Sequence, residues 1–253
     1  MSPTVLKRRV LATGLALLTA SLVLSGCASG TVRYEGTGTV VGTAPSAPDP
    51  VEEESSGLSE ADYEEFLDDV DGGISSADTY WTEHWAEFFP GEYISPSVHG
   101  DNGLYDGYDP SSDPGCGGQD LGPENAFYCI PEDYVAWDLS LMVNGFADGD
   151  TWIYLVIAHE WGHAIQARID PALVAEQTEL QADCFAGASI FGSVADGYLN
   201  LDDGDLAEIT SALSRLADAT EWTSTGDHGD PFQRIGAFDI GRQGGPTACF
   251  AGA

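Results

Sequence analysis

Two histidines four residues apart, His159 and His163, constrain this chain more than any other feature because they lie inside a long apolar segment. Residues 152–157 are mainly apolar, and Asp150 or Thr151 can cap their N-terminal end, so the pattern predicts an α-helix. With 3.6 residues per turn, both imidazoles project from one face of that helix. Histidine is a poor choice in a buried helix without a partner, which favours a metal site over two satisfied core histidines.

Glu160 directly follows the first histidine and points to the chemistry of the site. A metal ion held by the two rings lowers the pKa of bound water from near 16 to about 7. A carboxylate beside that water can act as general base and yield a hydroxide that attacks a peptide carbonyl. Zn²⁺ suits mixed imidazole and carboxylate ligands with one open position, so we predict a zinc hydrolase site with Glu160 as the base.

A catalytic zinc site usually has three protein ligands, so a further donor is expected after His163. Glu179 is the candidate, on a second helix that the sequence predicts over residues 171–195. Asp183 follows Glu179 by four residues, so it can accept a hydrogen bond from a ligand histidine and fix that ring. Glu176 is the competing ligand, and a solvated acidic helix face is the alternative for both glutamates.

Longer motifs surround these residues and continue towards the C-terminus. They read His159-Glu160-x-Gly162-His163-x-x-Gln166, Glu179-Leu180-Gln181-Ala182-Asp183-Cys184-Phe185-Ala186-Gly187, His228-Gly229 with Gln233-Arg234, and Cys249-Phe250. In these motifs, from about Tyr105 onwards, the chain resembles the bacterial neutral zinc metallopeptidases. The resemblance implies a gluzincin-like site, in which the two histidines and the later glutamate bind zinc and the glutamate of the first motif is catalytic. The chain departs from the family pattern at Asp230-Pro231, where small hydroxyl residues are expected.

His228 is the candidate for a second residue that contacts the substrate. Peptide hydrolysis builds negative charge on the carbonyl oxygen, and a hydrogen-bond donor stabilises that charge. His228 lies in a loop before a helix that Asp230 can cap, and Asp227 beside it could raise its pKa and keep it a donor. The alternative is a structural cap or a buried hydrogen-bond partner.

The remaining elements predict a mainly helical α+β domain, and the resemblance implies that it is zincin-like, with a short sheet beside the helix of the two histidines. Residues 134–139 form a strand by pattern, and in gluzincin-like enzymes an edge strand above the zinc helix pairs with the substrate backbone. Gly162 costs a helix about 1 kcal/mol relative to alanine, which indicates that another backbone approaches it closely. No role follows for Gln166. Further helices are predicted at residues 59–70, at 76–89, around Leu206 to Leu216, and after Pro231.

The N-terminal region has the features of an exported lipoprotein. Lys7-Arg8-Arg9 followed by the apolar run 10–24 predicts a secretory signal over residues 1–26. Leu24-Ser25-Gly26-Cys27 resembles a bacterial lipobox, which implies cleavage before Cys27 and acylation of that cysteine. A simple signal that happens to contain a cysteine is the alternative. Residues 27–57 are rich in small and polar residues and are expected to be a flexible tether, so residues 58–253 form the domain.

The other four cysteines form an even set, which favours two disulfides in an oxidising compartment. Three connectivities are possible. We favour Cys116 with Cys129 and Cys184 with Cys249, because the second bond would tie the C-terminal segment to the helix of Glu179. A cysteine zinc site is the alternative, although no C-x-x-C pair is present to hold one.

Charge excludes some partners. The chain has 8 basic and 42 acidic residues, and removal of residues 1–26 with their three basic residues leaves a net charge of −37 (5 minus 42). Nucleic acid and anionic lipid are therefore not expected partners. Asp101, Asp106 and Asp109 lie in a glycine-rich loop that could bind calcium, but their spacing misses the EF-hand pattern, and turns are the alternative.

Together these patterns predict a zinc metallopeptidase with a peptide or protein substrate, anchored by lipid to the outer face of a bacterial membrane. Two other classes remain open. One is a lipoprotein whose metal site serves stability or partner binding without hydrolysis, and the other is a solute-binding lipoprotein without tightly bound metal. Glu160 favours catalysis over the first of these, because a site that only holds metal has no need of that carboxylate.

Overall fold

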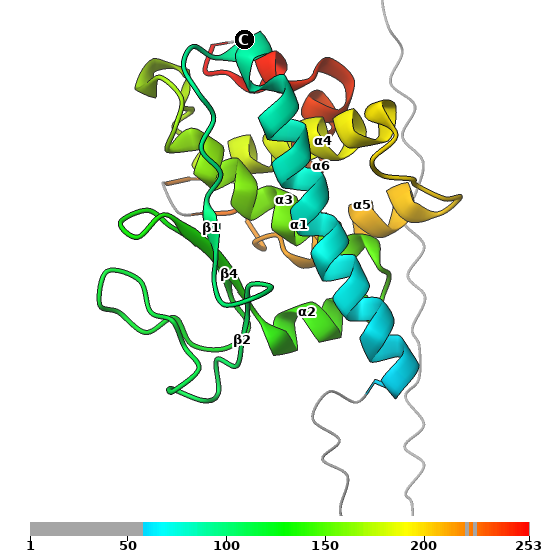
Figure 1. Ribbon diagram of the computed structural model, residues 1–253. Coiled ribbons are helices and arrows are strands. Elements are labelled where there is room, and N and C mark those ends of the chain that lie inside the picture. Colours follow the sequence, from blue (N-terminus) through cyan, green and yellow to red (C-terminus); the bar gives the residue numbers. More distant parts are fainter. Residues whose placement is uncertain (1–57, 221–222, 225–226, 253) are drawn as a thin grey trace, which may run out of the picture. The chain divides into compact units, whose positions relative to one another are not determined.

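The computed structural model describes residues 58–220, 223–224 and 227–252 (Figure 1). The predicted signal segment, Cys27 and the tether lie outside the described residues. The helices are α1 (Glu60–Phe88), α2 (Leu139–Phe146), α3 (Thr151–Gln166), α4 (Thr178–Asp196), α5 (Asp205–Arg215) and α6 (Pro231–Gly244), and two 3₁₀ turns, η1 and η2, span Pro171–Leu173 and Pro246–Cys249. The strands are β1 (Ser97–Val98), β2 (Leu104–Tyr105), β3 (Ala126–Cys129) and β4 (Tyr134–Asp138).

Helix α3, which carries the two histidines, is the central element of the core. It packs against α1, α2, α4 and α5 and against the sheet. Its side chains are buried on nearly every face, as expected of a helix that is apolar all round, and Ile153, Ile157 and Ile165 are fully buried. Asp150 stands at the N-cap, but its side chain makes no capping hydrogen bond, so packing holds this end of the helix. The helix that carries His159, Glu160 and His163 is therefore packed on nearly every side.

Helix α1 is one helix of 29 residues and not the two that the sequence predicts over 59–70 and 76–89. The predicted break falls on two glycines, which are poor helix formers. A Cβ atom on Gly72 would lie 2.8 Å from the Tyr154 hydroxyl, and one on Gly73 would lie 2.8 Å from Ile157 Cδ1. The glycines therefore let α1 pack closely against α3, and this packing outweighs their low helix propensity.

The predicted helix over residues 171–195 is also wrong in its first part. Asp170 caps only the single 3₁₀ turn η1, where its side chain accepts a hydrogen bond from the Ala172 backbone N–H. Val174 then adopts an extended conformation, and α4 begins at Thr178 and ends before Gly197, a residue with left-handed backbone. Because of this break, Glu176 lies in the segment before α4 and Glu179 lies in the first turn of α4, so the two do not share one continuous helix.

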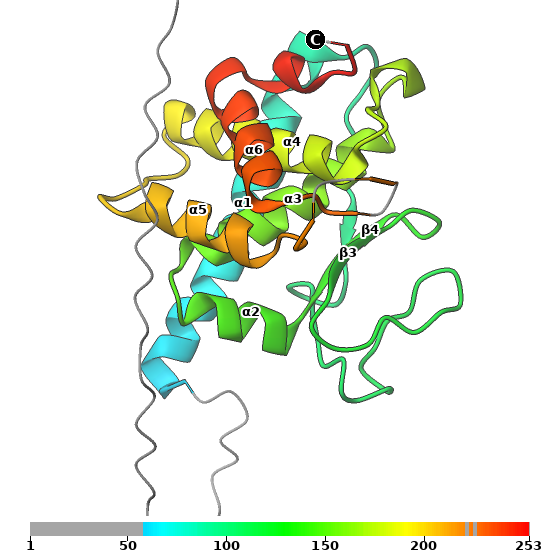
Figure 2. The ribbon, with the colours of Figure 1, turned by 180° about the vertical axis from the view of Figure 1, so that it is seen from behind.

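Strand β4 confirms the strand predicted at 134–139 but is not an edge strand. Strand β3 pairs antiparallel with it from Ala126 opposite Trp137 to Cys129 opposite Tyr134. Strands β1 and β2 pair in parallel with the two ends of β4, so they share its other edge. The edge beside α3 is formed by β3 (Figure 2), so any role in pairing with a substrate backbone falls to β3.

Asp138 holds together the two ends of the loop between β2 and β3. Its buried carboxylate accepts hydrogen bonds from the backbone N–H groups of Gly107, Glu124 and Leu141. Within that loop, Asp106 and Asp109 accept hydrogen bonds from backbone N–H groups two residues on, as turn residues do. Among the described residues, these aspartates belong to no group placed to hold a metal. Turns therefore account for the spacing that suggested calcium.

Both disulfides favoured by the sequence are present. Cys116 is bonded to Cys129, the last residue of β3, and Cys184 of α4 is bonded to Cys249 of η2. Paired cysteines cannot act as thiolate ligands, so the alternative of a cysteine zinc site is wrong. None of the helices in the described ranges has the length and hydrophobicity that a membrane span needs.

Candidate metal centre

His159 and His163 of α3 meet Glu179 of α4 at one point. Each imidazole Nε2 lies 3.2 Å from Glu179 Oε2, and the two rings are perpendicular with centroids 4.9 Å apart. The three residues form a group whose donor atoms all lie within 4.8 Å of one another, and Glu176 is not in that group. Glu179 reaches the rings from the first turn of its helix.

The distances from Glu179 to the two rings match those between ligands of a zinc ion. Donors that lie 2.0–2.1 Å from a tetrahedral zinc are about 3.3 Å from one another. Both observed Nε2 to Oε2 distances, 3.2 Å, are close to that edge length. Two imidazoles and one carboxylate are also the donor set of many catalytic zinc sites, so these residues fit the metal that the sequence predicts.

A close approach of α3 and α4 brings the donors together. A Cβ atom on Gly162 would lie 2.8 Å from the Ala182 carbonyl oxygen and 2.9 Å from its Cα. This confirms the prediction that another backbone lies against Gly162. Ala182 is one turn after Glu179, so the contact sets the distance between Glu179 and the two rings.

His159 is held by charged residues. Its Nδ1 lies 2.8 Å from Asp183 Oδ1, and the Asp183 side chain is fully buried. Arg234 of α6 binds the same carboxylate through two hydrogen bonds, from Nε at 2.8 Å and from Nη2 at 2.6 Å, and it also donates to the Leu216 carbonyl. Burial alone would raise the pKa of Asp183, but the Arg234 guanidinium holds it below its ordinary value.

The role of Arg234 is not apparent from the sequence, where it is only part of the family motif. A signal was available in its charge, since Arg234 is one of only five basic residues after residue 26 (8 minus 3). Such a rare cation in a strongly acidic chain is expected to have a specific partner.

His163 is held by an uncharged residue. Its Nδ1 lies 2.9 Å from Gln166 Oε1, and Gln166 Nε2 donates to the Thr178 carbonyl at 2.6 Å. The sequence suggests no role for Gln166, and the structure shows that its side chain contacts His163. The signal was its spacing, because a residue three positions after His163 lies on the same helix face.

The ionisation of the three donor residues is strongly coupled. Burial alone would lower the pKa of the His159 ring, but Asp183 raises it to about 10. Burial likewise opposes a charge on His163, whose pKa is raised by its hydrogen bond to Glu179. For Glu179, burial would raise the pKa, whereas the two rings hold it well below its ordinary range. The site thus stabilises an anionic Glu179 next to positive charge.

Glu160 faces a cavity of about 660 Å³, which is also lined by the three donor residues. Its side chain is buried, and burial raises its pKa while His159 and His163 partly offset that rise. Strand β3 and Ile130 form another wall of the cavity. The carboxylate is thus next to the donors and beside a space that is large enough for part of a peptide.

His228 lines the same cavity, with its side chain half-exposed and its Nε2 3.9 Å from Glu179 Oε2. The alternative of a buried partner is therefore wrong. Its backbone N–H donates to Asp218 Oδ2 at 2.7 Å, and its Nδ1 lies 3.8 Å from Asp218 Oδ1. The carboxylate of Asp227 instead accepts hydrogen bonds from Thr223 and Ser224. Asp218 and not Asp227 is therefore the acid beside this ring.

The sequence also matches a family model described as "Putative neutral zinc metallopeptidase" over residues 7–249. The chain belongs to this family. Membership confirms the resemblance seen in the motifs, and the described fold agrees with the predicted class, a mainly helical α+β domain with a small sheet beside the motif helix.

Two curated relatives of this zinc metallopeptidase family member come from Escherichia coli strains K12 and CFT073, and both are named "Uncharacterized protein YpfJ". Each is 34% identical over 166 residues, which cover 53% of this chain and 56% of the relative. The chain thus spans about half the length of the curated relatives that it matches. No solved structure matches the chain.

Proposed function

We propose that this family member is a zinc-dependent metallopeptidase that hydrolyses peptide bonds. The observation that carries the proposal is the placement of His159, His163 and Glu179 at the spacing of zinc ligands, with Glu160 beside them on a cavity. In this proposal the three residues hold Zn²⁺, and Asp183 fixes the ring of His159.

When bound, zinc supplies a Lewis acid that polarises the substrate carbonyl and makes water more acidic. Glu160 takes the proton from the attacking water at its carboxylate and returns it to the leaving amine. Burial supports this role, because it raises the pKa of Glu160 towards the range in which a carboxylate can both accept and release a proton. His228 donates a hydrogen bond to the negative charge that develops on the carbonyl oxygen.

The cavity wall supports an extended peptide as the substrate. Strand β3 borders the cavity next to the motif helix, and its second edge has no partner strand among the described residues. An extended chain can pair with such an edge through main-chain hydrogen bonds, which bind peptides of varied sequence. Both disulfides are typical of proteins exported to an oxidising compartment.

We also propose, from the sequence alone, that acylated Cys27 anchors the enzyme to a bacterial membrane. Labelling of growing cells with a fatty acid tests the anchor: the full chain is expected to take up the label, and Cys27→Ser is expected not to. Equal labelling of both would contradict it.

Glu160→Gln tests the proposed function in the full chain. We expect the variant to keep one zinc per chain and to lose cleavage of a peptide mixture, followed by mass spectrometry, by roughly 10²- to 10⁴-fold. Glu176→Gln is the matched control, an exposed glutamate outside the metal group that should leave cleavage unchanged. A chelator should abolish cleavage by the wild type, and His228→Phe should lower turnover by roughly 10²-fold with zinc retained.

Two outcomes would replace this function by another. A wild type that binds zinc but cleaves no peptide would make the chain a metal-stabilised binding module. A wild type purified without tightly bound metal would favour a solute-binding protein.

A further inference from the structure

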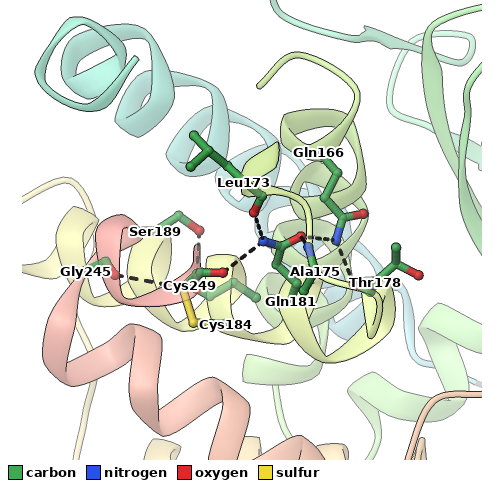
Figure 3. Close-up of a disulfide and its surroundings, with 10 residues drawn as sticks. Gln166, Leu173, Ala175, Thr178, Gln181, Cys184, Ser189, Gly245 and Cys249 are labelled. Carbon is green, nitrogen blue, oxygen red and sulfur yellow. Dashed lines mark hydrogen bonds between the residues drawn. A yellow bond between two sulfur atoms is a disulfide. The ribbon is translucent and has the colours of Figure 1, made fainter. Parts of the chain in front are cut away.

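Gln181 of α4 is a buried amide whose orientation is set by backbone atoms (Figure 3). Its Nε2 donates to the Leu173 and Cys249 carbonyl oxygens, both at 2.8 Å. Its Oε1 accepts from the Ala175 backbone N–H at 3.0 Å. A carbonyl can only accept and a backbone N–H can only donate, so the opposite orientation of the amide would break all three bonds.

Gln166 of α3 takes its orientation from this neighbour. Its Nε2 donates to the Thr178 carbonyl at 2.6 Å and to Gln181 Oε1 at 3.3 Å. Its Oε1 therefore faces His163 Nδ1, at 2.9 Å. An amide oxygen has no hydrogen to donate, so Nδ1 of His163 must carry the proton of this bond. In the neutral ring this leaves the lone pair on Nε2, the atom that faces Glu179.

We propose that Gln166 and Gln181 are positioning residues that hold His163 in the tautomer needed to bind the metal. The inference rests on the proposed zinc site, and it names the residues that select the tautomer of the second histidine, His163. The direction of every hydrogen bond in the series, from the Leu173 and Cys249 carbonyls to the imidazole, follows from main-chain atoms whose donor or acceptor character cannot change.

A covalent bond fixes the outer end of this series. Cys184 lies one turn after Gln181 on α4, and its disulfide to Cys249 holds the Cys249 carbonyl against the Gln181 amide. The Leu173 carbonyl is fixed as well, because it also accepts the Ala251 backbone N–H at 3.0 Å. The acceptors that orient Gln181 are therefore held in place by contacts outside the metal site.

Two substitutions at Gln166 separate positioning from simple packing. Gln166→Met keeps the approximate volume but removes the acceptor for His163. Gln166→Glu keeps an acceptor for the Nδ1 proton but loses the donor to Thr178, so it should lower stability and still hold the tautomer. If Gln166 only filled space, Gln166→Glu would be at least as harmful to the metal site as Gln166→Met.

The experiment measures the His163 ring directly and the zinc affinity separately, on the full chain. In ¹⁵N-edited NMR spectra we expect a slowly exchanging Nδ1–H signal of His163 in the wild type and in Gln166→Glu, and its loss in Gln166→Met. Competition with a chelator should show zinc affinity falling by roughly 10- to 100-fold in Gln166→Met and by less in Gln166→Glu. Gln243→Met is the matched control, since Gln243 is an exposed amide near the end of α6 and should change neither readout.

The outcomes keep the two proposals apart. Wild type and Gln166→Met with equal zinc affinity and the same Nδ1–H signal would overturn the inference and leave the proposed function intact. A wild type that binds zinc but cleaves no peptide would overturn the proposed function, and the Nδ1–H signal of the zinc-bound chain would still decide the inference. A wild type that binds no zinc would overturn both. If Gln166→Met does not fold, loss of the signal in Gln166→Glu overturns the inference, and its retention supports it.

Discussion

The two histidines of one helix are held in different ways, although both face Glu179 at the same distance. His159 is hydrogen-bonded to Asp183, which forms a buried pair of opposite charges with Arg234. His163 is bound to Gln166, which is uncharged and depends on backbone carbonyls and a disulfide. We call Asp183 with Arg234 the charged support and Gln166 with Gln181 the neutral support. The charged support requires that both of its residues be present, whereas the neutral support requires that the main-chain atoms around it stay in place.

The largest expected effect lies in the charged support. Arg234→Met should lower the free energy of unfolding of the zinc-free protein by about 3–5 kcal/mol, because it leaves the fully buried Asp183 without its cation. Urea denaturation measures the change. Arg242→Met, on the same helix in a partly exposed pair with Asp239, should cost less than about 1 kcal/mol. Equal losses in the two variants would contradict the difference between the supports.

Removal of the disulfide at the outer end of the neutral support should have the next largest effect. For a separation of 65 residues, the loss of loop entropy predicts a cost of about 4 kcal/mol for Cys184→Ser with Cys249→Ser. The matched pair, Cys116→Ser with Cys129→Ser, spans 13 residues and should cost about 3 kcal/mol. Thermal and urea unfolding measure both. Zinc affinity should fall further in the first pair than in the second, and the reverse order would argue against the link to His163.

Gln181→Met should have a smaller effect on stability, about 1–3 kcal/mol. It leaves the Cys249 carbonyl and the Ala175 N–H without the partner that Gln181 provides. This substitution leaves no buried charge without a partner, so the loss of stability should stay below that of Arg234→Met. Gln177→Met is the control, because the Gln177 side chain makes no capping bond at the start of α4, and its expected change is within about 0.5 kcal/mol. A cost for Gln181→Met above that for Arg234→Met would reverse the comparison.

The smallest effect is a pH dependence of stability that arises outside both supports. It comes from His84 of α1, whose ring contacts Asp196 at the end of α4. Burial alone would lower the pKa of His84, but its contacts with Asp196 and Glu87 raise it above 6.5. The ion pair should therefore stabilise the fold fully below about pH 6.5 and lose its effect as the pH rises through the raised pKa. Relative to His84→Gln, the wild type should gain about 0.2–1 kcal/mol at pH 6 and nothing at pH 9. An equal difference at both pH values would exclude this ion pair as the cause.

Of the charged support, Asp183 was within reach of the sequence, whereas the role of Arg234 and the contact between Gln166 and Gln181 were not. Asp183 follows Glu179 by four residues on one helix, so local spacing is enough to predict its place. The contact between Gln166 and Gln181 depends on the break after η1, where the chain leaves the helix predicted over 171–195. That break is stabilised by Gln181 itself, through bonds to Leu173 and Ala175, so no local rule predicts it.

Two glycine positions show the same limit. The sequence predicts close packing at Gly162, because a glycine in the middle of a helix lowers the stability of that helix. The structure confirms the close contact. The gap between the helices predicted at 59–70 and 76–89 contains Gly72 and Gly73, and this prediction fails because close packing against α3 stabilises an unbroken α1. A glycine signals close approach or interruption, and only the tertiary partner decides which.

The bond between Cys184 and Cys249 would make metal binding depend on the compartment in which the chain lies. Thiols stay reduced in the compartment where a bacterial chain is synthesised and become oxidised outside it. Under the export that we propose, the oxygen that secures the Gln181 amide would be locked only after translocation. A newly made chain would then hold metal weakly among the cell's own proteins and acquire full affinity beyond the membrane, so oxidation would serve as its activation step.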